Sequence, residues 1–343
     1  MMREASTEHA IRLINCHDSE PGWSWLQSIY FGEPAIEWQS VSTRHSAIMS
    51  KLPGPHYGRV RAAFKVAAAL RAGRADLLVT HGPYVSYYIE ALGRRGRHSV
   101  PHLAFSFNFT DFPSGFRFDQ MRRAFSNIDR FVVFSNMERQ LYSERFGIPI
   151  ERFTFVPWGV SPPIDTPVGR QLDQPYVAAA GGEARDYRTL CEAARRLPHV
   201  RFVIIVRPNS LEGIDVPENV TVHVNLPFRE TWSLIWHSEL ALISLRSHSS
   251  PNGLVTLVGG MHLGKAQVVT DSVGLHDYLK DGENVRVVAP NDPAAFSEAI
   301  TELLDDSALR EKLGTSARTF AAERCSEKVT VEAFRRLVKD LAS

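Results

Sequence analysis

Short apolar runs of strand length alternate with helical patterns along the whole chain, and this alternation restricts the fold more than any other feature. In the first half, strand-like runs lie at 11–15, 77–80, 102–107 and 130–134, and helical patterns lie at 59–72, 84–92, 118–127 and 137–146. Strands separated by helices pair in parallel, because the chain must cross over before it adds the next strand. The pattern therefore predicts a parallel sheet with helices on both faces.

A proline-rich segment at 156–175 interrupts this pattern, which then starts again. Proline lacks a backbone N–H and resists helices and central strands, so the segment is typical of a linker. Beyond it, strands are predicted at 176–180, 201–206, 220–224, 240–244, 267–270 and 285–288. Helices are predicted at 186–197, 229–237, 253–263, 275–280, 293–305, 307–323 and 327–341.

We therefore expect an α/β fold of two doubly wound, Rossmann-like domains that face each other across a cleft. The 343 residues suit two domains. The predicted N-terminal domain spans 1–160 and the C-terminal domain spans 161–325, and a last helix at 326–343 is expected to pack back on the N-terminal domain. Open parallel sheets bind ligands beyond the carboxyl ends of their strands, which makes the cleft the expected ligand site.

Composition excludes several classes of protein. The net charge of +1 argues against a dedicated nucleic-acid binder. Three scattered cysteines without a CxxC pair predict neither a zinc site nor a disulfide framework. No GxGxxG motif follows the first strand, and no Walker A, HExxH or GxSxG motif occurs. Because the N-terminus has no long apolar run, we expect a cytoplasmic protein without a spanning helix.

Basic residues concentrate in residues 51–100. This stretch holds nine Lys or Arg and two acidic residues, a net charge of +7. The basic residues are Lys51, Arg59, Arg61, Lys65, Arg71, Arg74, Arg94, Arg95 and Arg97. They are either the solvated faces of helices or a surface for an anionic partner, such as the inner face of a membrane.

A glycine pair followed by an arginine forms the first candidate site. A strand of small residues ends at Gly181 and Gly182, and Arg185 stands at the mouth of the next helix. Glycines let a ligand approach the backbone, and an arginine can hold a diphosphate with two parallel hydrogen bonds. The alternative interpretation is a tight turn with a surface arginine.

A second candidate site lies at an Asn-Gly turn before an apolar helix. Asn252 is expected to cap the helix, and Gly253 allows close approach of a ligand. The first amides of a helix have no partner within it and carry partial positive charge, so such an end binds phosphate. The amides of Asn252, Gly253 and Leu254 are the predicted ligands, and Thr256 contacts phosphate or caps backbone.

The motifs around these sites resemble those of retaining GT-B glycosyltransferases of the large family-4 type. The pattern of a glycine-rich turn, a basic residue and a Y-x-T-L helix is matched by Gly181, Gly182, Arg185, Tyr187, Thr189 and Leu190. The T-L-L-E-A-M-A-L-G-K-P-V-V-x-T-D block is matched by Thr256, Leu257, Met261, Leu263, Gly264, Lys265, Val268, Val269, Thr270 and Asp271. The G-x-x-x-Y-L-x-D-G-x-N continuation is matched by Gly274, Tyr278, Leu279, Asp281, Gly282 and Asn284.

The resemblance implies transfer of a sugar from a nucleotide-diphosphate donor to an acceptor, with the donor as co-substrate and no cofactor or metal ion. Arg185 and the amides at 252–254 would hold the diphosphate, and Gly22 would be the glycine of the N-terminal domain beside the phosphate. The acceptor is a small molecule, a glycolipid or a growing polysaccharide. The protein is expected to be a monomer or a homodimer.

The sequence departs from the family at three positions of the donor site. The paired glutamates of the E-x7-E motif fall at Pro251 and Gly259, so the carboxylate that usually binds ribose is absent. The second residue of the usual basic pair falls at Gly182, and Arg207 or Arg246 is its candidate replacement. These losses leave two rivals open, a non-catalytic GT-B partner protein and a pseudo-glycosyltransferase that joins rings other than sugars.

The family's catalytic histidine falls near Phe107 and Asn108, where this chain has none. His81, at the end of a predicted strand, is the candidate substitute, with a backbone-bonded turn histidine as the alternative. His248 is a further candidate. The predicted residues on the acceptor side are His17, Asp18, Asn108 and Asp111. Aromatic residues are dense at 81–92 and 104–118, and we expect some of them to pack in the core and the others to line an acceptor pocket.

Overall fold

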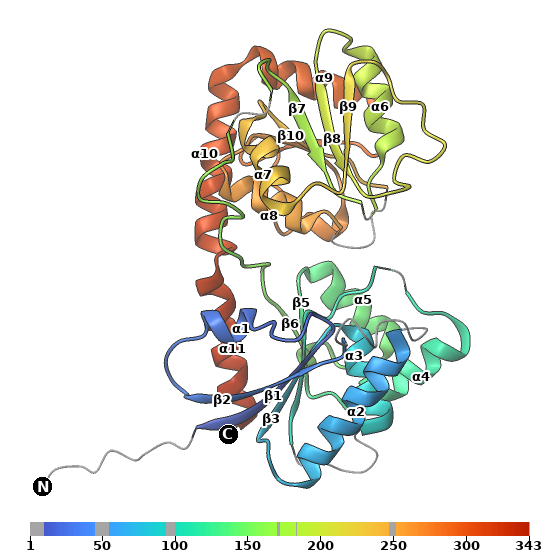
Figure 1. Ribbon diagram of the computed structural model, residues 1–343, viewed down its shortest axis with the longest axis vertical. Coiled ribbons are helices and arrows are strands. Elements are labelled where there is room, and N and C mark those ends of the chain that lie inside the picture. The colour runs from blue at the N-terminus through green and yellow to red at the C-terminus, as the bar shows by residue number, and fades with distance from the viewer. Residues whose placement is uncertain are drawn as a thin grey trace, which may run out of the picture. The chain divides into compact units, whose positions relative to one another are not determined.

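A computed structural model describes residues 10–44, 55–93, 100–110, 112–169, 172–182, 184–246 and 252–342. The chain divides into two compact units (Figure 1). The first unit comprises Met1–Val156 and Thr330–Ser343, and the second comprises Pro157–Val329. The proline-rich segment therefore begins where the first unit ends.

The first unit contains a six-stranded, fully parallel sheet in the order β2-β1-β3-β4-β5-β6. Its strands are β1 (Ile11–His17), β2 (Ile36–Ser42), β3 (Leu77–His81), β4 (His102–Phe105), β5 (Arg130–Val133) and β6 (Phe153–Phe155). Its helices are α1 (Trp25–Ile29), α2 (Pro55–Arg71), α3 (Pro83–Tyr88), η2 (Ile89–Gly93), α4 (Gly115–Phe125), α5 (Asn136–Phe146), η3 (Ile150–Arg152) and α11 (Glu327–Ala342).

Helices cover both faces of this sheet because its strands bury residues on both sides. One face packs against α2 through Ile14, Cys16 and Leu78 and against α4 and α5 through a cluster of phenylalanines. On the other face Phe334 of α11 contacts the rings of Trp38 and Phe105. The last helix of the chain therefore completes the core of the first unit.

The second unit contains another parallel sheet, in the order β12-β11-β10-β7-β8-β9. Its strands are β7 (Val177–Ala180), β8 (Phe202–Val206), β9 (Val220–Val224), β10 (Ala241–Ile243), β11 (Gln267–Thr270) and β12 (Arg286–Val288). Its helices are α6 (Tyr187–Arg196), α7 (Phe228–His237), α8 (Leu254–His262), η4 (Val273–Leu275), α9 (Pro293–Asp305) and α10 (Ser307–Arg324).

The helices of the second unit divide between the two faces of its sheet (Figure 1). Residues of α6 and α9 share one hydrophobic cluster with Val177, Ala179 and Phe202, and residues of α7 share another with Ala178 and Ala180. Alternate residues of β7 therefore face opposite helix layers, as in a doubly wound fold. The fold predicted for this half of the chain is confirmed.

One expected helix differs from the structure, and two observed elements, β2 and α1, were not expected. The predicted helix at 275–280 does not form: the 3-10 turn η4 ends at Leu275, and turns follow it. The side chain of Asn284 bonds the Lys280 amide at 2.9 Å and the Tyr278 carbonyl at 3.0 Å, which holds the backbone in these turns. The sequence pattern did not predict β2, which is half exposed and carries polar residues, or α1, which has only five residues. Within the described residues, no helix has the length and apolar character needed to cross a bilayer.

Candidate functional site

The strand order of the second sheet reverses between β7 and β10, which makes their carboxyl ends the expected binding position. From β7 the chain continues outward to β8 and β9, and from β10 it continues in the opposite direction to β11 and β12. Ligands of open parallel sheets bind outside the carboxyl ends of the strands at such a position. Both predicted donor motifs follow these two strands.

The loops after β7 and β10 are joined by backbone hydrogen bonds. Arg185 and Leu245 form an isolated antiparallel bridge, and the Arg246 amide donates to the Ala184 carbonyl at 2.9 Å. The Asp186 amide donates to the Ser244 carbonyl at 3.0 Å. The two motifs, which the sequence places in the same domain, therefore form one structure at the switch point.

Arg185 is buried within this structure, with only 8% of its surface exposed. Its Nη2 donates to Oγ1 of Thr256 at 2.9 Å, and its Nε donates to the Ala180 carbonyl at 3.2 Å. These two bonds fix the plane of the guanidinium before any ligand arrives. A fixed cation at a poorly solvated position binds an anion more strongly than a mobile surface arginine does.

The glycine pair after β7 is required by the packing of two arginines. A Cβ atom on Gly181 would lie 2.6 Å from Nη2 of Arg185, and its φ of +130° disfavours any other residue. A Cβ atom on Gly182 would lie 2.6 Å from Cδ of Arg207. The glycines thus let Arg185 and Arg207 lie directly against the turn, which fits the predicted role of Arg207 as a second basic residue.

Tyr187 holds this turn from within the core. Its hydroxyl donates to the Gly181 carbonyl at 2.5 Å, and burial raises the pKa of Tyr187 to about 12. The hydroxyl therefore stays protonated and remains a donor at neutral pH. Asp186 caps α6 by accepting from the Thr189 amide at 3.1 Å.

The amino end of α8 differs in one respect from the prediction. The N-cap residue is Gly253, with a φ of +86°, and no side chain caps the helix, so Asn252 does not have the capping role that we expected. A Cβ atom on Gly253 would lie 3.2 Å from Ile243 and Leu245 and 3.5 Å from Nη1 of Arg185. The start of α8 thus lies directly beside the arginine, where its dipole adds positive potential.

The position of the missing family glutamate is filled by an aromatic ring. A Cβ atom on Gly259 of α8 would lie only 2.1 Å from Cη2 of Trp232 in α7. The indole of Trp232 is buried and occupies the space into which a side chain at 259 would project. The other glutamate position, Pro251, and the candidate His248 lie outside the described residues.

Other motif residues of this unit stabilise the fold and do not reach the switch point. Lys265 donates to the Ser238 carbonyl at 2.6 Å, which caps the end of α7, and burial lowers the pKa of Lys265 to about 8. The hydroxyl of Tyr278 accepts from the Trp158 amide at 3.0 Å and fixes the start of the linker on the second unit. Family motifs thus mark structural as well as binding positions.

In the first unit, His81 lies at the carboxyl end of β3, beside β1, where that sheet reverses its order. Its Nε2 bonds Oδ1 of Asn15 at 2.8 Å, and its ring lies 4.9 Å from that of Trp23. Because an amide oxygen only accepts, Nε2 carries the proton and Nδ1 is the basic nitrogen. Burial lowers the pKa of His81 to about 3, so the ring is neutral at physiological pH.

Three predicted site residues at the end of β1 and in the loop after it have different environments: His17 and Asp18 were predicted for the acceptor side, and Gly22 for the donor phosphate. His17 is fully buried and bonds Oγ of Ser40 at 2.9 Å, so it contacts no acceptor directly, contrary to our expectation. The carboxylate of Asp18 pairs with Arg59 at 2.5 Å and accepts a hydrogen bond from the hydroxyl of Thr43. Both oxygens of this carboxylate therefore already have partners within the protein. Gly22 lies in an exposed turn with a φ of +97° and open space around its Cβ position, which leaves room for a ligand.

The loop after β4 carries Asn108, which is exposed, while the neighbouring Phe107 is buried in the aromatic core. The predicted Asp111 lies outside the described residues. The Phe109 amide donates to the hydroxyl of Tyr142 at 3.0 Å, and this hydroxyl donates to Oε1 of Glu138 at 2.8 Å. A buried carboxylate therefore holds the loop that presents Asn108.

Glu138 makes the stability of the protein depend on pH. Burial raises its pKa from 4.5 to about 7, so the folded state favours the protonated acid. Its contribution is complete below pH 4.5 and is lost as the pH rises through 7, by about 3 kcal/mol in total. We expect Glu138→Gln to reduce the loss of unfolding free energy between pH 5 and 8 in urea titrations. Glu144→Gln, on the exposed face of the same helix, is the control, and an equal slope in both variants would contradict the assignment.

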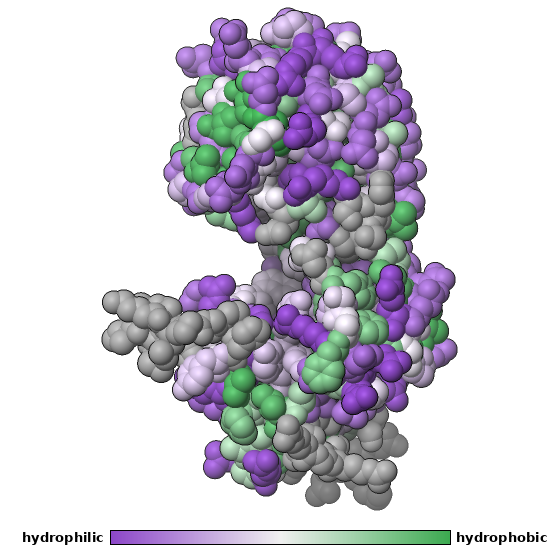
Figure 2. Space-filling view, turned by 90° about the vertical axis from the view of Figure 1, so that its right-hand side faces the viewer, coloured by the Kyte–Doolittle hydropathy of each residue, from purple (hydrophilic) through white to green (hydrophobic). Residues whose placement is uncertain are grey.

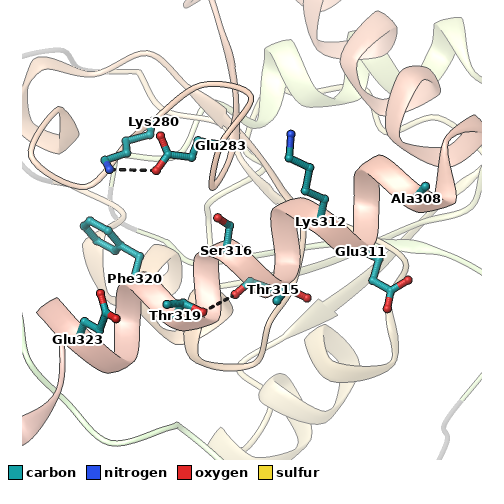
Figure 3. Close-up of a pocket in the computed structure, with 10 residues that line it drawn as sticks. All are labelled: Lys280, Glu283, Ala308, Glu311, Lys312, Thr315, Ser316, Thr319, Phe320 and Glu323. Atoms are coloured by element: carbon teal, nitrogen blue, oxygen red, sulfur yellow. Dashed lines mark hydrogen bonds and ion pairs between the residues drawn. The ribbon is translucent and has the colours of Figure 1, made fainter.

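A separate groove of about 600 Å³ lies in the second unit (Figure 3). It runs along α10, where Lys312, Ser316 and Phe320 project toward the turn that contains Lys280 and Glu283. Lys280 and Glu283 form an ion pair at 3.0 Å. The groove has mixed charge, and its lining comes from α10 and this turn, so it is not the switch-point site.

Two functional contributions escaped the sequence analysis. The role of Glu138 had a signal, because Ser135 and Glu138 form the S-x-x-E pattern of a capping box, and Ser135 does cap α5. No sequence signal indicated the placement of Trp232, because Trp232 and Gly259 are 27 positions apart in the sequence and lie in different helices. Only packing could reveal why Gly259 replaces a glutamate.

Comparisons with known proteins agree with this geometry. Residues 5–159 match the glycosyl transferase 4-like domain, and residues 186–320 match the glycosyl transferases group 1 family. The lipopolysaccharide core biosynthesis glycosyltransferase LpsE of Rhizobium meliloti (strain 1021) is 25% identical over 180 residues. That alignment spans 51% of this chain and 52% of the relative.

Solved structures with the same fold cover almost the whole chain. Sucrose-phosphate synthase of Thermosynechococcus elongatus has a TM-score of 0.72 at 15% identity, covering 96% of this chain and 99% of that one. Anabaena HepE in complex with UDP has a TM-score of 0.72 at 12% identity, covering 96% and 100%. The resemblance carried by the motifs is thus confirmed, and the chain belongs to the group 1 glycosyltransferases with the GT-B fold.

Proposed function

We propose that this protein transfers a sugar from a nucleotide-diphosphate donor to a glycan or lipid-linked acceptor. The observation that carries the proposal is the buried guanidinium of Arg185, fixed by Thr256 beside the amino end of α8. A diphosphate is strongly anionic. A fixed arginine and the amino end of a helix, both at the switch point, provide the positive potential that binds such a group. The diphosphate lies at Arg185 and the amides of residues 252–254.

In the proposed reaction the bond between the anomeric carbon and the β-phosphate oxygen breaks, and the diphosphate leaves with the electron pair. The acceptor hydroxyl forms the new glycosidic bond, and its proton passes to the departing phosphate. Attack from the face that the diphosphate leaves gives retention of configuration. Catalysis then consists mainly of stabilising the leaving charge, the kind of electrostatic effect that pre-positioned donors provide.

His81 has the proposed role of a neutral hydrogen-bonding group toward the sugar. Its Nδ1 is the acceptor nitrogen, because Nε2 is engaged by Asn15. A ring with a pKa of about 3 stays neutral throughout the physiological range and offers a lone pair without a charge. Asn108 belongs to the proposed acceptor side of the first unit, and the open turn at Gly22 is the proposed position of that unit beside the donor phosphate.

Uridine diphosphate sugars are the first donors to test, because the structural relative HepE binds UDP. A thermal-shift screen against UDP, GDP, ADP, CDP and dTDP, with and without magnesium, identifies the base. A nucleotide at about 100 times its Kd stabilises the fold by about 2.7 kcal/mol. Release of that nucleotide from its sugar conjugate, with the anomer assigned by NMR, then tests transfer.

Each result of this screen separates the proposal from its rivals. Binding followed by transfer with retention supports the proposal, and an inverted product overturns its stereochemistry. Binding with a product that lacks a glycosidic bond identifies a pseudo-glycosyltransferase. No binding to any nucleotide identifies a non-catalytic partner protein and refutes the donor site.

We also propose that the first unit contacts an anionic membrane through α2. The helix carries four basic residues, Arg59, Arg61, Lys65 and Arg71, and no acidic residue. Phe64 is 58% exposed on its outer face next to Lys65. Hydrophobic and hydrophilic residues are mixed on the lower unit in Figure 2. Arg94, Arg95 and Arg97 of the basic stretch lie outside the described residues.

The membrane contact predicts that Phe64→Ser combined with Lys65→Glu weakens binding to phosphatidylglycerol vesicles about tenfold or more, since each basic residue contributes about 1 kcal/mol. Co-sedimentation measures this. Val224→Ser, an exposed apolar residue of the second unit, is the control. Equal binding of both variants, or binding to purely zwitterionic vesicles, would show that the basic stretch is only a solvated face.

A further inference from the structure

Four buried polar side chains form a continuous network in the core of the first unit. Oε1 of Glu90 lies 2.5 Å from Nδ1 of His102, and only 1% and 0% of these two side chains are exposed. Nε2 of His102 lies 2.8 Å from Oγ1 of Thr80, and this hydroxyl lies 2.7 Å from Oγ of Ser86. Oγ of Ser86 donates to the Gly82 carbonyl at 2.8 Å. We call these four side chains the buried polar network.

The network ends on both sequence neighbours of His81, the proposed hydrogen-bonding group toward the sugar. Thr80 precedes His81 in β3, and Gly82 follows it. Because successive residues of a strand point to opposite faces, the network holds Thr80 on one face of β3 while the His81 ring lies on the other. The Gly82 carbonyl is bonded to Ser86, and the Gly82 amide donates to the Phe105 carbonyl at 3.0 Å. The backbone is therefore fixed on each side of His81.

The carbonyl at the end of the network sets the direction of its hydrogen bonds. A carbonyl only accepts, so Ser86 donates its single hydroxyl proton to Gly82 and must accept from Thr80. Thr80 then accepts from Nε2 of His102, which therefore carries a proton. A further proton lies between Nδ1 of His102 and Glu90, because a bare ring nitrogen and a carboxylate are both acceptors. The pair thus has no net charge, whichever atom holds this proton.

Stability alone does not account for a polar pair at this position. On this face of the sheet the neighbours of Thr80 include Cys16 in β1 and Leu78 in β3, which belong to a hydrophobic cluster. Apolar residues of similar volume in place of a buried pair often give equal or higher stability, because they require no desolvation. A buried polar network instead fixes one arrangement of the groups that it joins. Glu90 also lies in η2, a π-helical turn, which is a rare backbone form that recurs at functional sites.

We infer that the Glu90–His102 pair is a positioning element for sugar transfer: through Thr80 it fixes the end of β3 and thereby directs the His81 ring. The inference rests on the proposed function and on the role of His81 within it. Glu90 and His102 are fully enclosed in the core and act only through the residues that flank His81.

Replacement of the pair by apolar side chains is the first test. Glu90→Met combined with His102→Leu keeps a similar volume, so we expect the unfolding midpoint in urea to equal or exceed that of the unsubstituted protein. We expect kcat to fall about tenfold to 100-fold and the KM of the nucleotide donor to change less than about twofold, since small misplacements of a reacting group have such effects. A folded variant with normal kcat overturns the inference. A variant that fails to fold also overturns it, because the pair would then be structural.

A double-mutant cycle tests whether the effect passes through His81. Thr80→Val removes the hydroxyl that joins the pair to β3 and keeps the shape of the side chain. It should lower kcat about tenfold alone and have no further effect in the His81→Ala background, because residues that act as a unit are not additive. Equal reductions in both backgrounds overturn the inference. Thr80→Ser should restore most of the rate, and Thr301→Val, which removes a hydroxyl bonded to the Ser297 carbonyl in α9, is the control.

Nitrogen-15 NMR of the histidine rings tests the network without an activity assay. Nε2 of His102 should carry a bound proton at neutral pH, and an unprotonated Nε2 overturns the inference. The kinetic results also separate this inference from the proposed function. Absence of any transfer by the unsubstituted protein refutes the proposed function itself, whereas full activity of His81→Ala refutes the role of His81 and the positioning role of the pair with it.

Discussion

Arg185→Ala is expected to lower kcat/KM for sugar transfer by roughly 100- to 1,000-fold, the cost of removing one pre-positioned donor from a site of developing negative charge. The substitution removes the only side chain that we find bonded to both Thr256 and the end of β7 within the described residues. Arg185→Lys should recover a minor part of the activity, since lysine keeps the charge and loses the planar fork. Steady-state release of the nucleotide measures the effect.

Arg195, in the last turn of helix α6, provides the control for this substitution. Arg195 pairs with Asp215 at 2.8 Å on the surface of the second unit, so Arg195→Ala removes an equal charge far from the glycine turn. Its transfer rate should match that of the unsubstituted protein. If Arg185→Ala retains more than a tenth of the normal rate with unchanged nucleotide affinity, the clamp is not the donor site.

Gly259→Glu, which restores the family's glutamate, is expected to destabilise the second unit rather than improve catalysis. Its Cβ would lie 2.1 Å from the ring of Trp232, and its carboxylate would be buried without a partner. An uncompensated buried charge costs about 3–5 kcal/mol. The unfolding midpoint in urea should fall accordingly, with no gain in affinity for the ribose form of a nucleotide.

Val255→Glu is the control, because it introduces the same carboxylate one turn earlier on the exposed face of α8. Its unfolding free energy should change by less than about 0.5 kcal/mol, as is usual for surface substitutions. A stable Gly259→Glu protein that binds ribonucleotides more tightly would mean that Trp232 moves aside. That result would remove the packing explanation for the missing glutamate.

Much of the second sheet was predictable, because its central strands β7, β8, β10 and β11 are buried on both faces and patterned helices separate the strands. All six of its strands were expected, and α9 begins and ends where Asp292, Pro293 and the run up to Asp305 predict. The edge strand β2 was not predictable, since its exposed residues carry no apolar run. Local pattern identifies buried strands and capped helices, and it misses elements that depend on a neighbour for their stability.

The candidate site was predictable to the extent that its chemistry is local. The glycine turn, Arg185 and the start of α8 adjoin strands in the sequence, so parallel-sheet topology alone places them at one edge. The burial of His17, the pairing of Asp18 with Arg59 and the ring beside Gly259 are contacts between distant segments. Sequence patterns contain no information on such contacts, which decide whether a polar residue is available to a ligand.

The position of Phe334 affects how this protein is made. The first unit begins at the N-terminus, yet part of its core is supplied by α11, whose Phe334 packs on Trp38 and Phe105. A ribosome synthesises the whole second unit before it reaches this helix. The aromatic surface of the first sheet that α11 covers therefore stays uncovered until α11 leaves the exit tunnel. Chaperone demand during translation and sensitivity to C-terminal truncation both follow from this order of synthesis.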